Sequence, residues 1–558
     1  MIKNNEGNNK FSDDSSKVNS AVKLFENTSI FKSLFKIVTL AIIVSLATGI
    51  YVFVDQILMV RIIPLNHYFS QSNVFGNEQF ESIKKLIDEK SQMMESIPSL
   101  AVSSIVRTSV SLSSPLTLIC TAISLLLGLG TSIAYSKDLG KKDYKKATLT
   151  WSNGFYNTLI TSLITSAILI GLTFILIPVQ ANQTNAEKLI GDQYLSKWNQ
   201  SEINTLQNFL NYTRNISINW AVQYSLIIIG FNVFNNYIML FISLLNSEGK
   251  NAIPTAFILI SNVLNIALDF ALLYLTTLGI NAAAIATVIS WIIGVAIFVS
   301  FIWWQNKKKL TLLEFKYLKI KEFRFDYKII LYIFAIGIAS FFRNASTAVY
   351  SLIQQSIYGQ ITQPITGKEQ TYYLTILGAV NPIYNLFFSA IIGVIRGART
   401  VITYNYVRNE QQKVQKAYLI SMAMAFVYAF IFFIIVSFIL QNQFLWLFDI
   451  IPGHSNYNDA LILLRVIMGQ LLLFSFTISG MLYFQSTGKP IRSIISSIMY
   501  GTIIGIPGLF IASEIAKATN NMDIYIYSPL IIISISGLLV FTYSTYYVFK
   551  KPKIYIEY

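Results

Sequence analysis

Charge is scarce in this sequence, and so are the residues that build many metal sites. Asp, Glu, Lys and Arg make up 12% of the 558 residues, whereas hydrophobic residues make up 54%. A soluble domain carries roughly 25% charged residues, so most of this chain must lie in lipid. The single cysteine, Cys120, falls inside an apolar run, and the two histidines, His67 and His454, lie far apart. These shortages exclude a disulfide framework and a thiolate metal site.

Long apolar runs recur along the chain from residue 35 to residue 549. A helix that crosses about 30 Å of hydrocarbon at ~1.5 Å per residue needs about 20 apolar residues. Lipid offers the backbone no partners, and the runs are too long and too uniform for barrel strands, so we predict an all-α membrane protein. The twelve predicted spans are 35–63, 109–135, 148–178, 216–245, 254–277, 279–305, 327–357, 372–395, 417–439, 460–484, 491–512 and 529–549.

The positive charge is unevenly distributed between the loops. The net charge is +15, and if the N-terminus is cytoplasmic, 29 of the 42 lysines and arginines fall on the cytoplasmic side and ten fall outside. This is the positive-inside pattern, which predicts that both termini are cytoplasmic. We therefore expect a multi-pass protein of the bacterial cytoplasmic membrane, and the basic balance indicates topology rather than a nucleic-acid partner.

Two pairs of similar segments indicate an internal repeat. GLGTSIAY from Gly128 matches GARTVITY from Gly397, and NSEGK at 246–250 matches QSTGK at 485–489, in the same order. Together they predict two parallel six-helix halves related by an axis along the membrane normal. The predicted segments are a disordered cytoplasmic N-terminus (1–34), an N-terminal bundle (35–305), a basic amphipathic cytoplasmic linker (306–326), a C-terminal bundle (327–549) and a cytoplasmic tail (550–558).

Only two acids lie within the predicted spans, Asp55 in the first and Asp269 in the fifth. A charge at membrane depth costs at least ~2.5 to 3.5 kcal/mol, so such residues are usually functional. Asn262 and Asn265 share a helix face with Asp269, at spacings of three and four residues. Asp55, Asp269 and Thr287 all lie about 12 Å below the outer surface at ~1.5 Å per residue.

Equal depth predicts a shared cation site of Asp55, Asn265, Asp269 and Thr287. Hard ions such as Na⁺ prefer several oxygen ligands, and a buried carboxylate also binds a proton readily. The second half has no counterpart, because the position that corresponds to Asp269 is Gly508. We therefore expect the coupling ion, Na⁺ or H⁺, to bind the first half.

Arg343 and Arg465 are the long-chain cations well inside the second half. They could place positive charge in a cavity, or pair structurally with Asp55 or Asp269. Pairing is the simpler alternative, and it would remove the reason to assign the acids a function. Two further arginines, 396 and 399, stand at the cytoplasmic end of the eighth span, where we expect them to anchor the topology.

Three segments resemble the multidrug and toxic compound extrusion (MATE) family, within the larger group that also contains lipid-linked oligosaccharide flippases. They are VDQILMVRI in the first span, GLGTSIAYSKDLGKKDYKKA after the second, and the run from LLNSEGK to AAIATVIS at 244–290. The last has a Glu-Gly turn, then Asn-x-x-x-Asp, then Gly-Ile-x-Ala-Ala. The likeness covers nearly all of residues 35–549.

The resemblance implies two six-helix bundles that form a V around a central cavity and open alternately to each side. In prokaryotic members the N-terminal bundle carries a cation site, whose residues match Asp55, Asn265, Asp269 and Thr287. Another branch uses acids of the C-terminal bundle, which this sequence lacks. The family turn usually has Arg where this chain has Ser247, and the long outer loops 64–108 and 179–215 are also atypical.

We therefore expect a secondary-active multidrug exporter that exchanges amphipathic, often cationic, compounds for Na⁺ or H⁺. The alternative is a lipid or lipid-linked oligosaccharide flippase, which would need cavity cations to meet phosphate. We expect no cofactor, no nucleic-acid partner and a monomer in contact with membrane lipids. A membrane enzyme is disfavoured because the sequence has no nucleophile elbow, HExxH, P-loop or paired metal motif.

Overall fold

The computed structural model describes residues 29–90, 97, 100–141, 143–250, 252–319 and 321–550. Over these residues the fold is helical, without strands. Ten helices are long and apolar enough to cross a membrane, and two bent pairs bring the number to as many as twelve. The predicted all-α fold of twelve spans is confirmed. The predicted disordered N-terminus (1–34) is wrong for its last residues, because α2 begins at Ile30, while residues 1–28 and the tail from 551 lie outside the described residues.

Each predicted span corresponds to a helix or to a broken helix. The first six are α2 (Ile30–Ile62), α5 (Val102–Gly140), α6 (Tyr144–Gln180), α8 (Gln200–Gly230) with α9 (Asn232–Ser247), α10 (Ala252–Leu275) and α11 (Ile280–Lys307). The last six are α12 (Tyr327–Thr366), α13 (Tyr372–Val407), α14 (Gln411–Ile434), α16 (Tyr457–Ser486), α17 (Pro490–Ile498) with α18 (Ile506–Thr519), and α19 (Asp523–Phe549).

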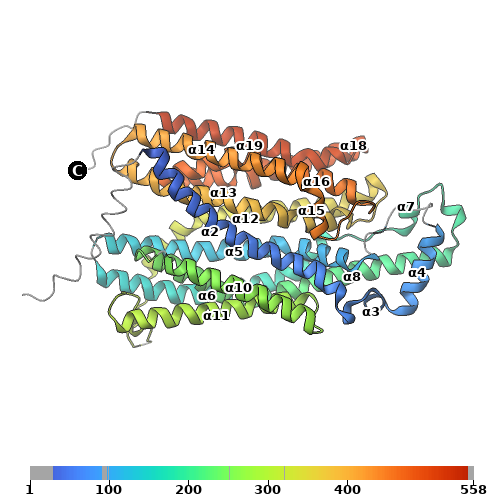
Figure 1. The fold of residues 1–558 in the computed structure, drawn as a ribbon, viewed down its shortest axis with the longest axis horizontal. Coiled ribbons are helices and arrows are strands. Elements are labelled where there is room, and N and C mark those ends of the chain that lie inside the picture. Colours follow the sequence, from blue (N-terminus) through green and yellow to red (C-terminus); the bar gives the residue numbers. More distant parts are fainter. Residues whose placement is uncertain are drawn as a thin grey trace, which may run out of the picture.

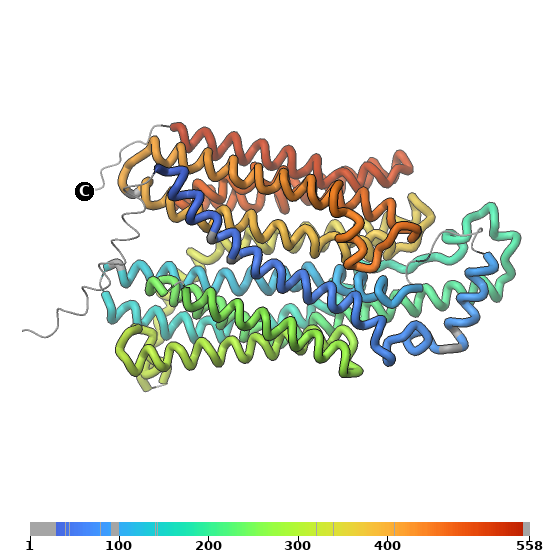
Figure 2. Tube along the Cα trace, in the orientation of Figure 1, coloured from blue at the N-terminus to red at the C-terminus, as the bar shows by residue number. Residues whose placement is uncertain are grey.

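The helices form two lobes that lie side by side (Figure 1). The first lobe contains α2, α5, α6 and α8 to α11, and the second contains α12 to α14 and α16 to α19. We call the end where the described chain starts and stops the inner end, and the opposite end the outer end. The tube trace shows that α2 runs diagonally across the molecule, from the second lobe at the inner end to the first lobe at the outer end (Figure 2).

Glycines allow the two lobes to approach closely. A Cβ on Gly393 of α13 would lie 2.7 Å from the Ala41 carbonyl oxygen of α2, and one on Gly337 of α12 would lie 2.2 Å from the Leu126 carbonyl oxygen of α5. Without hydrophobic driving force in lipid, such close backbone contact supplies packing between membrane helices. The pairs α2 with α13 and α5 with α12 therefore hold the lobes together.

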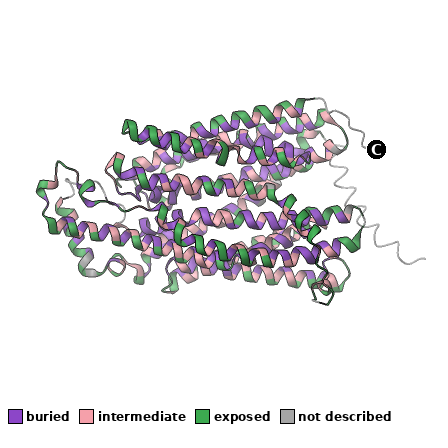
Figure 3. Cartoon of the chain, turned by 180° about the vertical axis from the view of Figure 1, so that it is seen from behind, coloured by how far each residue is buried: buried purple, intermediate pink, exposed green. Residues whose placement is uncertain are grey.

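Two helices bend where they cross the interior. The axis turns by 46° between α8 and α9, at Phe231, and α12 turns by 51° between Ile338 and Ser340. Seen from behind, buried residues face the middle of the molecule and exposed residues its outside (Figure 3). The bends leave room for a cavity near the centre of this packed region.

The long outer segments form a small helical cap on the first lobe. A surface helix, α4 (Asn77–Lys90), follows the short α3 (Gln71–Phe75), and α7 (Ala186–Ile190) lies at the same end (Figure 1). Phe75 stacks on Phe80 with ring centroids 5.6 Å apart, and Lys90 Nζ lies 2.7 Å from Glu202 Oε2. The cap therefore has a core and ion pair of its own.

The predicted linker is packed against the first lobe. Leu313 is fully buried, the Trp151 indole N–H donates to the Glu314 carbonyl oxygen over 3.3 Å, and Asn153 Oδ1 accepts from Asp326 N over 2.9 Å. Glu248, from the Glu-Gly turn, accepts from Thr311 Oγ1 at 2.8 Å. The connection is thus anchored at the inner end of α6 and α9 rather than free in solvent.

Candidate functional site

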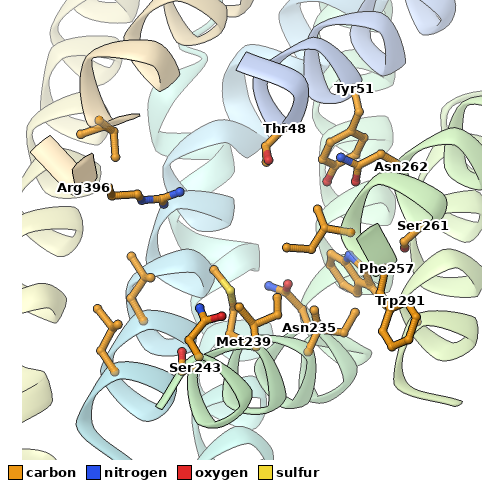
Figure 4. A pocket seen from close by; sticks show the side chains of 18 of the residues that line it. Thr48, Tyr51, Asn235, Met239, Ser243, Phe257, Ser261, Asn262, Trp291 and Arg396 are labelled. Atoms are coloured by element: carbon orange, nitrogen blue, oxygen red, sulfur yellow. The ribbon is translucent and has the colours of Figure 1, made fainter. Parts of the chain in front are cut away.

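A cavity of about 500 Å³ lies between the lobes and reaches from mid-molecule to the inner end. Its first-lobe wall combines amides with aromatic and aliphatic side chains, while its second-lobe wall carries arginines. Figure 4 shows Arg396 projecting from one side of this space, across from Phe257 and Trp291. The residues that line it include Phe257, Asn265, Thr287, Trp291, Arg343, Arg396, Arg399 and Gln485.

Polar contacts close the lobes together at the outer end. Arg107 is 2% exposed, and one of its Nη atoms donates to the Phe448 carbonyl oxygen and, over 3.2 Å, to that of Asp449. The Asp449 carboxylate accepts from Arg61 at 3.1 Å and from Ser103 at 2.6 Å. These contacts join α2 and α5 to the segment after α15 (Gln441–Leu447), so the cavity is sealed on this side and extends to the inner end.

The two acids predicted from the sequence meet in the first lobe. Asp55 of α2 is 6% exposed and Asp269 of α10 is 0% exposed. Their carboxyl groups lie close enough to act on each other. Two bare carboxylates repel at such a distance, so the arrangement needs a shared proton or a cation. No ion pair joins either acid to an arginine or lysine of the described chain, which removes the structural-pairing alternative there.

Asn265 and Thr287 connect the acid pair to the cavity. In the orientation that satisfies its neighbours, the Asn265 amide donates to Asp269 Oδ2 over 3.2 Å and accepts from Thr287 N over 3.3 Å. The same amide lies 3.3 Å from Thr287 Oγ1. Both residues also line the cavity, whereas the two acids lie behind them. All four residues predicted for the cation site are therefore brought together.

The donor set suits a small hard cation. Asp55 Oδ1 and Asp269 Oδ1 are buried without any hydrogen-bond partner, and such orphaned oxygens are costly unless a ligand satisfies them. Oxygen ligands are what Na⁺-like ions require. Within the described residues no three His, Cys, Asp or Glu side chains cluster as a transition-metal site would require. The pocket can hold a proton or a cation with mostly oxygen ligands.

The arginines differ from the sequence-based expectation. Arg343 lines the cavity, but Arg465 does not: it is exposed, donates to Gln441 Oε1 over 3.0 Å and lies over the Phe438 ring. Sequence depth placed both arginines inside a span, yet it does not fix the direction in which a helix points each side chain. Arg396 and Arg399, expected to be anchors, line the cavity with Arg343.

Sequence reasoning also missed the outer-end residues. It placed Arg107 in the outer loop 64–108, two residues before the predicted start of the second span at 109. In the structure Arg107 belongs to α5 and is buried between the lobes. Extending the predicted span by two residues at its outer end would have included Arg107, and α5 does extend beyond the predicted span at both ends.

Relatives of this chain were found by sequence. Residues 347–511 match the family model described as MatE. The chain is 29% identical over 517 residues to the "Uncharacterized protein MG447 homolog" of Mycoplasmoides gallisepticum, covering 90% of this chain and 87% of that protein. It is 23% identical over 467 residues to the "Multidrug export protein MepA" of Staphylococcus saprophyticus, covering 81% and 90% respectively.

Solved structures share the fold. An inward-facing MATE family transporter superposes with a TM-score of 0.64 at 16% identity, covering 88% of this chain and 98% of that one. An outward-facing one gives 0.61 at 17% identity, covering 95% and 99%. A third match is a Pyrococcus furiosus transporter described as having a binding pocket of reverse polarity, with a TM-score of 0.59 at 16% identity, covering 95% of this chain and 98% of that one.

The sequence motifs, the helical architecture and these matches agree with one another. The family model covers α12 to α18 within the second lobe, and the relatives extend across both lobes. The solved structures have the same helical fold. Sequence and fold thus both relate the chain to the multi-pass membrane transporters of the MATE family.

Proposed function

We propose that this transporter is an ion-coupled exporter, in which Na⁺ or H⁺ bound by Asp55 and Asp269 drives an amphipathic compound out of the cell. The observation that carries the proposal is the buried acid pair, which adjoins the cavity through the Asn265 and Thr287 side chains. The staphylococcal MepA relative, named as a multidrug export protein, supports the direction of transport.

Coupling needs a cation that favours one conformation of the protein over another. Asp55 lies on α2, which crosses between the lobes, while Asp269 lies on α10 of the first lobe. A bound cation pulls the two helices together, and its loss leaves two charges that repel. Because α2 also packs closely on α13 through Gly393, its movement acts directly on the contact between the lobes.

Alternating access then follows from the two ends of the molecule. The structure has a cavity that reaches the inner end and an outer end held by Arg107, Arg61 and Asp449. Binding of the ion at the acid pair would favour the state in which these outer contacts separate. The predicted orientation, with the inner end in the cytoplasm, makes the present conformation the one that loads substrate.

A flippase is the second candidate, and the three cavity arginines favour it. It would use the same fold and the same ion site, but its cargo would carry a negative head group. The matches to known proteins do not separate the two candidates, because both occur in the same superfamily. The charge of the cargo separates them.

Transport by the purified chain in proteoliposomes tests the coupling. With Na⁺ and H⁺ gradients imposed separately, we expect one of the two gradients to drive accumulation of a fluorescent amphiphile, and Asp55→Asn or Asp269→Asn to abolish that dependence. Asp138→Asn is the matched control, since Asp138 is a buried acid of the same lobe that accepts from Thr150 Oγ1 over 2.7 Å outside the cavity. Wild-type coupling in both acid variants would refute the proposal.

A further inference from the structure

We infer that the second-lobe wall of the cavity is a binding site for the anionic head group of an amphipathic substrate, a phosphate or a carboxylate held by Arg343, Arg396 and Arg399. This inference rests on the proposed function in one respect, that the cavity is where the transported compound binds. It names the chemical class of that compound. It also assigns a role to three arginines that neither ion coupling nor the outer seal uses.

The three guanidinium groups share one space. Arg343 comes from α12, Arg396 and Arg399 come from α13, and all three line the cavity. They lie close enough for their positive charges to act on one another. Like charges in a partly desolvated space repel more strongly than in water. Such a cluster therefore raises the energy of the empty cavity and favours the entry of an anion.

The arginines lack partners that would neutralise them. No ion pair joins any of the three to an acid within the described part of the chain, and the cavity lining contains no Asp or Glu. Arg399 donates through Nη2 to Gln485 Oε1, and its buried Nε has no partner. Guanidinium groups present a planar set of donors that matches the oxygens of phosphate and carboxylate, so the unmet donors have a natural ligand.

The backbone directs these side chains into the cavity. Arg396 and Arg399 are three residues apart and so share one face of α13. Between them Gly397 packs on α2, where an added Cβ would lie 2.8 Å from Val38 Cα, so the face that carries the arginines is not the face buried against α2. Arg343 follows the 51° bend of α12. The close packing of α13 on α2 therefore also positions Arg396 and Arg399 toward the cavity.

The opposite wall suits the apolar part of the same compound. Phe257 and Trp291, from α10 and α11, lie across the cavity from Arg396 (Figure 4). A ligand with a negative head and an apolar body can contact both walls at once. A cation at the arginine wall would instead meet three like charges. The expectation of an often cationic cargo therefore does not suit this part of the cavity.

Lipids matched in their chains but different in their head groups provide the test. Native mass spectrometry of the full-length protein in detergent can compare short-chain phosphatidate with phosphatidylcholine of the same chains. We expect the wild type to bind phosphatidate at least about tenfold more tightly. The preference should fall by about tenfold in Arg343→Gln and in Arg396→Gln, since each removes one charge-assisted contact. Arg465→Gln, which removes an arginine of the same lobe outside the cavity, should change nothing.

Three further arms make the result decisive. Arg343→Lys and Arg396→Lys keep the charge but not the planar fork, so partial binding by these variants excludes misfolding as the cause. Competition by inorganic phosphate alone indicates that a free anion is accepted, whereas its failure indicates that the lipid body is needed. Tetraphenylphosphonium, an apolar cation, should not displace phosphatidate. Equal affinity for both lipids, or the same loss in Arg465→Gln, would overturn the inference.

The outcome is separable from that of the coupling proposal. Binding is measured without a gradient, and Asp55→Asn should still bind phosphatidate. If the phosphatidate preference is absent while gradient-driven transport persists, the anion site is wrong and ion coupling stands. If the preference is present while Asp55→Asn and Asp269→Asn transport normally, the anion site stands and the coupling assignment falls.

Discussion

The two lobes repeat one arrangement of helices but bring opposite charges to the interior. The first lobe holds Asp55 and Asp269 behind the cavity, and the second lobe lines it with Arg343, Arg396 and Arg399. Within the described chain no ion pair joins these two sets, although they border the same space. A repeat of the fold therefore fixes where helices stand, and the chemistry of each lobe is set separately. Keeping acids and arginines unpaired leaves both available to ligands.

At the outer end the polarity is reversed and the charges do meet. There the first lobe supplies the cations, Arg61 and Arg107, and the second lobe supplies the acid, Asp449. Arg61 Nη1 lies 3.1 Å from Asp449 Oδ1, and its guanidinium lies 4.6 Å from the centre of the Trp446 ring. Opposite charges in contact hold the structure closed, whereas opposite charges held apart bind ligands. The predictions below test each part of this contrast.

Placing an acid in the second lobe should have the largest effect. Gly508 takes the position that corresponds to Asp269, and a Cβ there would lie 2.7 Å from Ile532 Cγ1. Gly508→Asp adds both a steric clash and an unpaired charge at membrane depth, so we expect about 4 kcal/mol of lost stability. Thermal unfolding in detergent measures it, with Gly508→Ala as the steric control. If the two variants are equally stable, the second lobe can accept an acid and the contrast between lobes is accidental.

Breaking the outer seal should have the next largest effect. Arg107→Ala leaves the Phe448 and Asp449 carbonyl oxygens without their buried donor, which costs about 2 kcal/mol. We expect faster labelling by a water-soluble maleimide of a cysteine placed at Thr375, whose hydroxyl lies 2.6 Å from that of Thr108 across the lobes. The background carries Cys120→Ser.

Arg214→Ala is the matched control for this experiment. Arg214 also donates to a backbone oxygen at the outer end, that of Ala181 over 2.6 Å, but the contact lies within the first lobe. Labelling that rises equally in both variants would mean that the loss of any arginine at the outer end increases access to position 375. The seal between the lobes would then not depend on Arg107.

A smaller effect is expected at the edge of the ion site. Thr287→Ala removes the hydroxyl that lies 3.3 Å from the Asn265 amide, so we expect about tenfold weaker binding of the coupling ion. The measurement is ion-dependent thermal stabilisation of the purified protein. Ser290→Ala, one turn along the same cavity-lining helix, changes a hydroxyl that bonds only its own backbone and should leave the affinity unchanged. An unchanged affinity in Thr287→Ala would remove that residue from the site.

The sequence predicts how deep each residue lies in the membrane, but it does not predict in which direction its side chain points. Hydropathy and helical rise fix depth, so the twelve spans and the meeting of Asp55 with Asp269 could be predicted. They do not fix the direction of a side chain around the helix, so Arg465 was placed with Arg343 although it points elsewhere. Nor do they show where a cavity ends, so Arg396 and Arg399 were taken for anchors. Those features depend on how the lobes pack, which one span cannot reveal.

The smallest effect is expected at the inner end, where the contact between the lobes is weak. Lys137 Nζ of α5 donates to the Tyr332 hydroxyl of α12 over 3.0 Å and lies 4.4 Å from the centre of that ring, in an exposed position. An exposed contact of this kind contributes less than about 1 kcal/mol. Lys137→Ala should therefore change thermal stability far less than Arg107→Ala, with Lys145→Ala, on the same inner surface, as the control.

The direction of the Lys137→Ala effect on conformation is also defined. The contact joins α5 to α12 beside the opening of the cavity. When the inner end closes, more contacts of this kind must form between the lobes. Its loss should lower the fraction of molecules that are closed at the inner end. The measurement is maleimide labelling of Asn246→Cys in the cavity, which the coupling ion should protect less in Lys137→Ala than in the wild type. If Lys137→Ala instead destabilises the protein as much as Arg107→Ala does, the inner end is as firmly held as the outer end, and the proposed difference between a sealed and an open end is lost.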